Sequence, residues 1–354
     1  MIYVYIFILM LLSWGLSFLT EYIPKQVLSV IMWTMTVLML ILAATKPFTT
    51  ASDYNNYLDM FNNYDSLKYE LSVEPTYLYI SRFVNSVGGP FRVMTWIYAI
   101  IALPLKMYAL RRISSYDLFF AGLPIYLSNF FLLHDTEQIR LGAAMAFVIM
   151  AYVYRTEGKK WYVWVPVWLL AITFHYTSAV ALAPLMLCSQ KPLSQFVRVM
   201  LSVLVFAGVV IWVLKINLIS LIPIPLLEAK MALYELSISK GEEMETILLY
   251  HPIALLRYAT FFYVLCFYDT IRQYFKHINI VLIAEALGLF AWGGLSETAV
   301  FAVRISELFQ VPEFLLFASV MYTLRPSWVG RVYVMGVAMY ILLYGIRINQ
   351  FGYI

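Results

Sequence analysis

The chain has 354 residues, of which 63% are apolar and 12% are charged, with a mean hydropathy of +0.80 and a formal net charge of +4. This composition excludes a soluble globular domain, and so small a net charge points by itself to no particular partner. Tyrosine and tryptophan are abundant, as expected for residues at the two membrane–water interfaces. We therefore expect an integral membrane protein.

Apolar runs of about 15 to 20 residues recur along the whole chain, and each can cross a hydrocarbon core when helical. They are apolar on all sides rather than alternating with period two, which favours helices over a barrel. We predict an all-α polytopic membrane protein with about 12 transmembrane helices (range about 10–13), forming a single integral membrane domain over residues 1–354. The predicted spans are 2–20, 27–45, 91–110, 118–133, 139–154, 161–174, 176–188, 197–216, 253–268, 279–296, 307–323 and 332–346.

The short connections between these spans are rich in lysine and arginine, so the positive-inside rule places them in the cytoplasm. Two longer segments, about 46–90 and 217–252, then face the periplasm. The basic residues of the short connections are Lys25, Arg111, Arg112, Arg155, Lys159, Lys160, Lys191, Arg198, Arg272, Lys276, Arg325 and Arg331.

The stretch 161–188 tests this topology, because it is one long apolar run between two basic connections. A single tilted helix would carry Lys191 and Arg198 to the wrong side of the membrane. Two short helices that go out and back resolve the conflict. The tip of this hairpin is the sequence FHYTS, which places His175 at the periplasmic end beside Tyr176.

The first periplasmic segment contains two features of short helices. Asp53, Tyr57 and Phe61 recur at helical spacing and so share one face. Glu74 precedes Pro75, which predicts a helix beginning there with a carboxylate at its positive end. The apolar pattern of PTYLYISRFV predicts that this helix lies flat on the bilayer rather than crossing it.

Three arginines, Arg140, Arg304 and Arg257, enter spans from the periplasmic side. A charge just inside a span is costly unless it is paired or faces a wet cavity. For each arginine alone, the alternative is snorkelling or an ion pair with a nearby acid (Asp135, Glu137 or Glu307). Three that enter from one side favour an anion site, because guanidinium groups bind phosphate bidentately and suit a diphosphate at the membrane surface.

Five sequences that follow one another between the predicted helices carry a resemblance. These are SDYNNYLDMF, EPTYLYI, QIRLGAAMAF, FHYTSAVALAP and AVRISELFQVPEFLLF. Together they resemble the EpsG-like branch of bacterial polysaccharide polymerases, which includes Wzy-type O-antigen polymerases. The resemblance covers residue 1 to about residue 320. The chain departs from it in one respect, since relatives often carry an arginine shortly before the Asp-Tyr pair, where this chain has only Lys46.

The resemblance implies a polymerase at the periplasmic face of the bacterial inner membrane, similar to GT-C-like lipid-linked glycosyltransferases. Such an enzyme transfers the growing glycan from undecaprenyl diphosphate to the sugar of the next undecaprenyl-diphosphate-linked repeat unit. The implied partners are these lipid-linked oligosaccharides, as donor and acceptor, and membrane lipids. A chain-length regulator protein is a further candidate partner, and neither nucleic acid nor a cofactor is expected.

This chemistry needs cations near the departing diphosphate and a base near the acceptor hydroxyl. Candidates for the base are His175, Asp53 and Glu74, and those for binding the diphosphate are Arg140, Arg304 and Arg257. Candidates for binding the rest of the substrate are Tyr57, Tyr176 and Gln138. No required metal is predicted, because the sequence has no Asp-X-Asp pair and no His/Cys cluster at metal-ligand spacing.

Several structural alternatives stay open at this point. His175 could be a hydrogen-bonded residue at the hairpin tip, and Asp53 and Glu74 could be helix caps or solvated loop residues. The acids near Arg140 are expected to be its loop partners, together with His134. Glu285 lies in the middle of a span, and the sequence suggests no partner for it.

Three other functions compete with a polymerase. A transporter or flippase of a lipid-linked glycan would also need outward-facing arginines, but we find no internal repeat of the kind that such folds carry. A membrane scaffold would not need arginines within spans. An O-antigen ligase-type transferase uses the same chemistry, and only the resemblance favours the polymerase over it.

Overall fold

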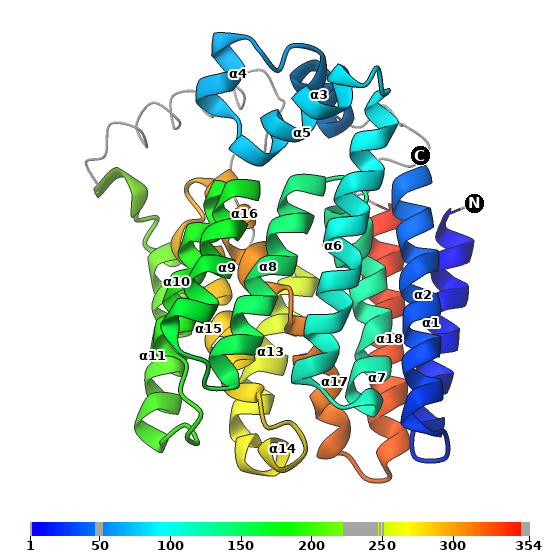
Figure 1. Ribbon diagram of the computed structural model, residues 1–354. Helices are drawn as coiled ribbons and strands as arrows, with labels where there is room; N and C mark the ends of the chain where they lie inside the picture. The colour runs from blue at the N-terminus through cyan, green and yellow to red at the C-terminus, as the bar shows by residue number, and fades with distance from the viewer. Residues whose placement is uncertain (1, 47–51, 222–246, 248, 250, 348–354) are drawn as a thin grey trace.

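The computed structural model describes residues 2–46, 52–221, 247, 249 and 251–347. Within these ranges the chain is helical and contains no strand, so it is an all-α protein (Figure 1). Seven helices in these ranges are long and apolar enough to cross a membrane, and five shorter apolar helices accompany them. The chain is therefore a polytopic, multi-pass membrane protein.

The seven long helices are α1 (Ile2–Leu19), α2 (Lys25–Thr45), α6 (Phe91–Ile113), α7 (Tyr116–Tyr126) continued by the π-helical segment η1 (Leu127–Asp135), α8 (Ile139–Thr156), α11 (Gln195–Val213) and α18 (Ser327–Arg347). The shorter ones are α9 (Trp161–Phe174), η2 (Tyr176–Ala181) with α10 (Leu182–Leu187), α13 (Pro252–Cys266), α15 (Ile278–Gly294) and α17 (Glu313–Ser319) with η4 (Val320–Tyr322). A short helix, α14 (Tyr268–Tyr274), connects α13 to α15, and η3 (Ile219–Leu221) follows α11.

Every predicted span coincides with one of these helices except the eleventh, predicted over 307–323. There the structure has two helices, because α16 (Ala299–Gln310) ends before Pro312 and α17 begins at Glu313. A proline has no backbone N–H to donate, and its ring clashes with the carbonyl group four residues earlier. The single predicted helix is therefore wrong, and α16 is an element that the prediction missed.

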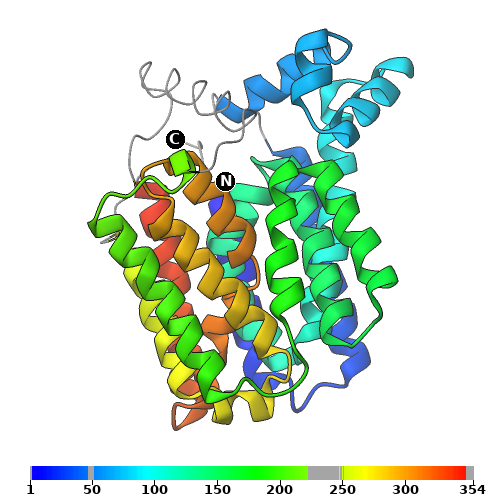
Figure 2. The same ribbon diagram turned by 90° about the vertical axis from the view of Figure 1, so that its left-hand side faces the viewer.

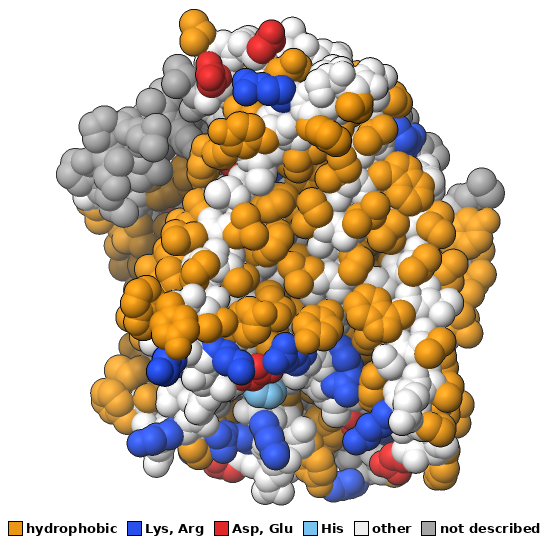
Figure 3. All heavy atoms as spheres, viewed as in Figure 1, with side chains coloured by type: hydrophobic (Ala, Val, Ile, Leu, Met, Phe, Trp, Pro, Cys, Tyr) orange, Lys and Arg blue, Asp and Glu red, His pale blue; other side chains and the backbone are white. Residues whose placement is uncertain are grey.

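The two ends of the bundle differ in charge and in the length of their connections. Three short helices, α3 (Ser52–Asn62), α4 (Leu67–Ser72) and α5 (Pro75–Ser86), lie at one end, which we call the outer end (Figure 1). Lysine and arginine side chains gather at the opposite end, which we call the basic end (Figure 3). The first residues of α1 and the last residues of α18 lie toward the outer end, as the alternation of the predicted spans requires.

The three outer helices form a cap with its own aromatic core. The cap lies over the side of the bundle that holds α6, α8 and α9 (Figure 2). The Tyr57 and Tyr77 rings stack with 5.8 Å between their centroids, and the Tyr77 hydroxyl donates to the Tyr57 carbonyl at 2.6 Å. Tyr98 of α6 and Phe174 of α9 continue this core into the bundle. α5 lies across the outer ends of the bundle helices rather than alongside them.

Close backbone contact between α11 and α15 depends on two glycines, Gly208 and Gly293. A Cβ atom on Gly293 would lie 2.7 Å from the carbonyl oxygen of Gly208, which no side chain can occupy without moving a helix. Small residues at such crossings allow the backbones of membrane helices to approach closely. The other core helices pack in pairs, α6 and α9 against α8, α1 against α7, and α2 against α6.

We expect Gly293→Ala to lower the stability of the bundle, because overpacking a tight contact costs about 1–3 kcal/mol. Thermal unfolding of the purified protein in detergent, followed by tryptophan fluorescence, measures this change. Gly336→Ala is the matched control, since Gly336 is also helical and a Cβ there has no neighbour within 4 Å. Equal unfolding temperatures for the two variants would contradict the expected packing.

Candidate functional site

The hairpin predicted around FHYTS is present at the outer end. α9 ends at Phe174 and η2 begins at Tyr176. His175 lies between them and is the N-cap residue of η2. The Thr177 backbone N–H donates to His175 Nδ1 at 3.3 Å, and Thr177 Oγ1 lies 2.7 Å from the same nitrogen. Because Nδ1 accepts from the backbone, a neutral His175 carries its proton on Nε2.

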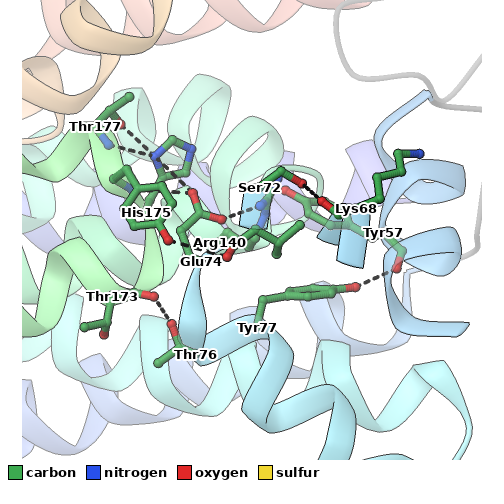
Figure 4. A network of polar contacts seen from close by, with 12 residues as sticks. Tyr57, Lys68, Ser72, Glu74, Thr76, Tyr77, Arg140, Thr173, His175 and Thr177 are labelled. Carbon is green, nitrogen blue, oxygen red and sulfur yellow. Dashed lines mark hydrogen bonds and ion pairs between the residues drawn. The ribbon is translucent and has the colours of Figure 1, made fainter. Parts of the chain in front are cut away.

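Glu74 lies at the centre of the polar contacts beneath the cap (Figure 4). It is the residue directly before α5, forms an ion pair with Arg140 of α8, and accepts a hydrogen bond from the Tyr176 N–H at 3.4 Å. Its Oε1 lies 4.0 Å from His175 Nδ1. Burial by itself would raise the pKa of Glu74, but the charges of Arg140 and His175 outweigh it and hold that pKa below its ordinary value.

Arg140 is held by aromatic faces as well as by Glu74. Its guanidinium carbon lies 5.1 Å from the centroid of the Tyr57 ring and 5.7 Å from that of Tyr77. The Arg140 side chain is 18% exposed and that of Glu74 is 6% exposed, so the pair is largely removed from water. A pair in this setting is strongly coupled, since losing one partner leaves a buried charge.

The local acids that we expected to pair with Arg140 bind other groups, so that expectation was wrong. Asp135 pairs with Lys106 of α6 at 2.6 Å, and Glu137 pairs with Lys46 at the end of α2. His134 Nδ1 lies 3.0 Å from Oε1 of Gln138, the residue that precedes α8. These contacts join η1 to α6 and the residues after η1 to the end of α2, while His134 contacts the residue before α8.

Asp53, the second residue of α3, faces three cations. The charges of Arg304, Arg140 and Lys46 all act on its carboxylate. Burial raises the pKa of Asp53, and the three cations offset only part of that effect, so the pKa lies above its ordinary value. The charges of Arg140 of α8 and Arg304 of α16 thus both act on Asp53, and we call this group of charged side chains the outer chamber.

Arg257 lies deeper and is already paired. Its Nε lies 3.0 Å from Oε1 of Glu313 on α17, and both side chains are buried. Glu285, for which the sequence suggested no partner, lies within the electrostatic range of Arg257 and Glu313. Arg257, one of the three arginines proposed from the sequence, thus has two buried carboxylates beside it, those of Glu313 and Glu285.

Glu307, which the sequence suggested only as an ion-pair partner for an arginine, links this deeper group to the outer chamber. The charges of Arg257, Arg304 and Asp53 act on it, and its Oε2 lies 3.9 Å from His134 Nε2. Its position three residues after Arg304 on one helix was a signal that could have indicated its place.

A groove of about 230 Å³ opens beside Glu74 at the outer end. Tyr176 lines it, and so do Val73 and Pro75, which flank Glu74 in the sequence. Its other lining residues are Tyr64, Glu70, Leu78, Tyr79 and Arg82. Tyr79 of the cap and Tyr176 of the hairpin are 67% and 43% exposed, so both rings are accessible in the groove.

Tyr57 lines a different and smaller pocket of about 30 Å³, together with Lys46, Tyr54 and Arg92. The structure thus brings Asp53, Glu74, Arg140, His175, Tyr57 and Tyr176 together under the cap, with Arg304 acting on Asp53. Gln138 is set toward η1 by its contact with His134. Within the ranges that the structure describes, no three His, Cys, Asp or Glu side chains are grouped to hold a metal ion.

The fold and the site together define a multi-pass membrane protein that gathers arginines, carboxylates and exposed aromatic rings at one end of its bundle. A model of the EpsG family matches residues 30–350, and the chain belongs to this family. Membership supports a function of membrane glycosyltransferase or polymerase type. The curated proteins and the solved structures gave no match to the chain.

We expect Glu74→Gln to detach the cap from the bundle, because it leaves Arg140 buried without its counter-charge, at a cost of about 3–5 kcal/mol. Hydrogen–deuterium exchange over residues 67–86 should become faster by at least about tenfold. Glu70→Gln is the control, since Glu70 is an exposed carboxylate of the same cap. Unchanged exchange in Glu74→Gln would show that the ion pair does not hold the cap.

Acid should weaken the same contact. The pKa of Glu74 is lower in the folded protein than its ordinary value of 4.5, so the pair contributes fully above that value and is lost as pH falls through the lowered pKa. Thermal unfolding between neutral pH and about pH 3 should show this loss in the wild type but not in Glu74→Gln. The same acid sensitivity in both proteins would assign it to other groups.

Proposed function

We propose that the protein is an O-antigen-type polysaccharide polymerase of the bacterial inner membrane. It would transfer the growing glycan from undecaprenyl diphosphate to the sugar of the next undecaprenyl-diphosphate-linked repeat unit, with the outer end facing the periplasm. The observation that carries this proposal is that Arg140 and Arg304, from separate helices, both act on Asp53 in the outer chamber.

The reaction forms a bond between the acceptor hydroxyl oxygen and the anomeric carbon of the donor sugar. The bond from that carbon to the diphosphate oxygen breaks, and undecaprenyl diphosphate leaves with the electron pair. The acceptor hydroxyl gives its proton to a base. Negative charge thus develops on the departing diphosphate, where fixed guanidinium groups stabilise it most effectively.

Arg304 and Arg140 are the cations best placed for the diphosphate. Arg304 and Arg140 both act on the half-buried Asp53, and Arg140 also pairs with Glu74 while its guanidinium lies near two aromatic faces. Arg257 is a weaker candidate, because Glu313 and Glu285 already offset its charge. We propose that Arg257 acts on the outer chamber indirectly, through its charge interaction with Glu307.

Asp53 is the best candidate for the base among the three that the sequence suggested. A raised pKa makes its carboxylate a stronger proton acceptor than an ordinary aspartate. Glu74 has a lowered pKa and is occupied by Arg140, and His175 Nδ1 already accepts a hydrogen bond from Thr177. We therefore propose that Glu74 and His175 position the chamber, and that Asp53 accepts the proton.

The aromatic groove beside Glu74 is suited to the sugar part of the substrate. Exposed tyrosine rings present flat apolar faces and polar hydroxyl groups, which match the alternating C–H and O–H surfaces of a pyranose. Glu70 and Arg82 line the same groove and offer an acceptor and donors for sugar hydroxyls. The groove adjoins Glu74, so a sugar bound there would lie next to the chamber.

We expect Arg304→Gln and Arg140→Gln to abolish long-chain glycan and to leave single repeat units, since removing one charge-stabilising donor typically costs about 10²–10³ in rate. Gel banding of the extracted surface glycan, with protein abundance measured in parallel, shows the outcome. Arg325→Gln, at the basic end, is the control. Undiminished ladders in both variants would overturn the proposal, and loss of all surface glycan with repeat units trapped inside the cell would favour a flippase.

We expect Asp53→Asn to lower the rate of glycan extension by about 10²–10⁴, the range for a general base. His175→Gln should lower it far less, because a positioning residue does not take the proton. In the wild type, the rate should fall as pH drops through the raised pKa of Asp53, and Asp53→Asn should remove this dependence. Purified protein with lipid-linked repeat units measures both, and an acid limb that persists in Asp53→Asn would assign the base elsewhere.

A further inference from the structure

A second polar cavity, of about 340 Å³, lies at the basic end of the bundle, where the proposed reaction does not use it. It is formed where the end of α8, the connection after α10 and the α14–α15 connection meet. Its lining residues are Thr156, Cys188, Ser189, Gln190, Arg272, Gln273, Lys276, His277 and Asn279. Lysine and arginine side chains gather at this end of the molecule, with a histidine among them (Figure 3).

The walls of this cavity are fixed by hydrogen bonds of their own. The buried Asn279 amide donates to the carbonyl oxygens of Ser189 and Lys191, both at 2.8 Å, and accepts from the Tyr268 hydroxyl at 2.7 Å. The Gln190 amide donates to the Thr156 carbonyl at 3.1 Å. The cavity is therefore held open by the protein itself and needs no ligand to form.

The charge of the lining is one-sided. Arg272 and Lys276 are cationic, His277 can become so, and none of the lining residues is a carboxylate. Arg272 is oriented by its Nη2, which donates to the Gln190 carbonyl at 2.9 Å. Its buried Nε–H has no partner among the described residues. The charge of Glu157 acts on His277, and Glu157 Oε2 accepts a hydrogen bond from Arg112 Nη2 at 2.9 Å.

Apolar side chains surround the opening of the cavity, as expected for a site at the membrane interface. Met186 and Leu187, which directly precede Cys188 in the wall, are 64% and 60% exposed, so an apolar surface begins at the rim. Tyr274, on the neighbouring α14, is also exposed, as tyrosine often is at the membrane interface. Basic pockets between helices at such an interface bind phosphate-containing lipid headgroups.

We propose that this cavity binds the phosphate group of an anionic phospholipid, with Arg272 and Lys276 as its ligands and the acyl chains lying along Met186 and Leu187. The inference does not depend on the proposed polymerase activity. A bound headgroup would join three connections of the chain, since the lining comes from α8, α10 and α14–α15. Free phosphate shares the same chemistry and is the second possible source of the ligand.

The test uses the full-length protein in detergent. Native mass spectrometry measures the retention of phosphatidylglycerol and of cardiolipin against phosphatidylcholine, and thermal unfolding is followed while each lipid is added. Inorganic phosphate is titrated in a parallel arm. The variants are Arg272→Gln with Lys276→Gln, and Lys276→Gln alone, because the exposed Lys276 has no role in the hydrogen bonds of the wall. Lys25→Gln with Arg325→Gln removes the same charge at the same end and is the control.

We expect anionic lipids to bind more tightly than phosphatidylcholine, and the double variant to lower that affinity by at least about tenfold, because two charge-assisted contacts are lost. The single variant should show a smaller loss, and the control less than about a twofold change. Stabilisation by anionic lipid without any effect of inorganic phosphate alone identifies the headgroup as the ligand, whereas stabilisation by inorganic phosphate with no preferential retention of anionic lipid identifies the free anion and overturns the lipid assignment. Equal losses in the variants and the control, or equal binding of anionic and neutral lipids, would overturn the proposal.

Discussion

The ion pair between Glu74 and Arg140 is the contact on which the outer end of the molecule depends. It joins the start of α5 to the start of α8, and the Tyr176 N–H brings the hairpin tip onto the same carboxylate. An unpaired arginine or an unpaired carboxylate buried here would destabilise the fold, because each would lose its hydration. The ion pair offsets this loss for both side chains. The cap, the aromatic groove and the chamber keep their relative positions because this pair fixes three segments at one point.

The outer chamber and the deeper group beneath it handle charge in opposite ways. Arg257 is surrounded by Glu313 and Glu285, so its charge is offset within the bundle. Asp53, in contrast, faces Arg304, Arg140 and Lys46, although Arg140 and Lys46 each also pair with another acid. The deeper group therefore offsets its charges within the bundle, whereas Asp53 is acted on by three cations from α16, α8 and the end of α2.

Much of the fold could be predicted because its causes are local in sequence. The apolar runs set the spans, and the two basic connections around 161–188 required a hairpin with His175 at its tip, as observed. Glu74 before Pro75 correctly marked the start of α5. The break at Pro312 was missed, because length and hydropathy dominated the prediction, although the proline itself was a visible signal.

The pairing of charges could not be predicted, because it is decided by which segments meet in space. Arg140 has acids close by in sequence, yet its partner is Glu74, 66 positions away, while Asp135 and Glu137 pair with lysines on α6 and α2. The end of the π-helical segment η1 lies close to Gly142 of α8. A Cβ on Gly142 would lie 2.3 Å from the His134 carbonyl oxygen, so this close approach requires glycine.

In the proposed polymerase reaction, the groove beside Glu74 has a consequence for the length of the glycan. Tyr79, Glu70 and Arg82 line it and are exposed, so one side of the groove is open to the surroundings. A glycan that lengthens by one unit in each cycle could extend outward through that side, whatever its number of sugars. The groove would thus bind only the last few sugars and would not limit the length of the glycan. The final length of the polymer would then depend on how often the chain is released.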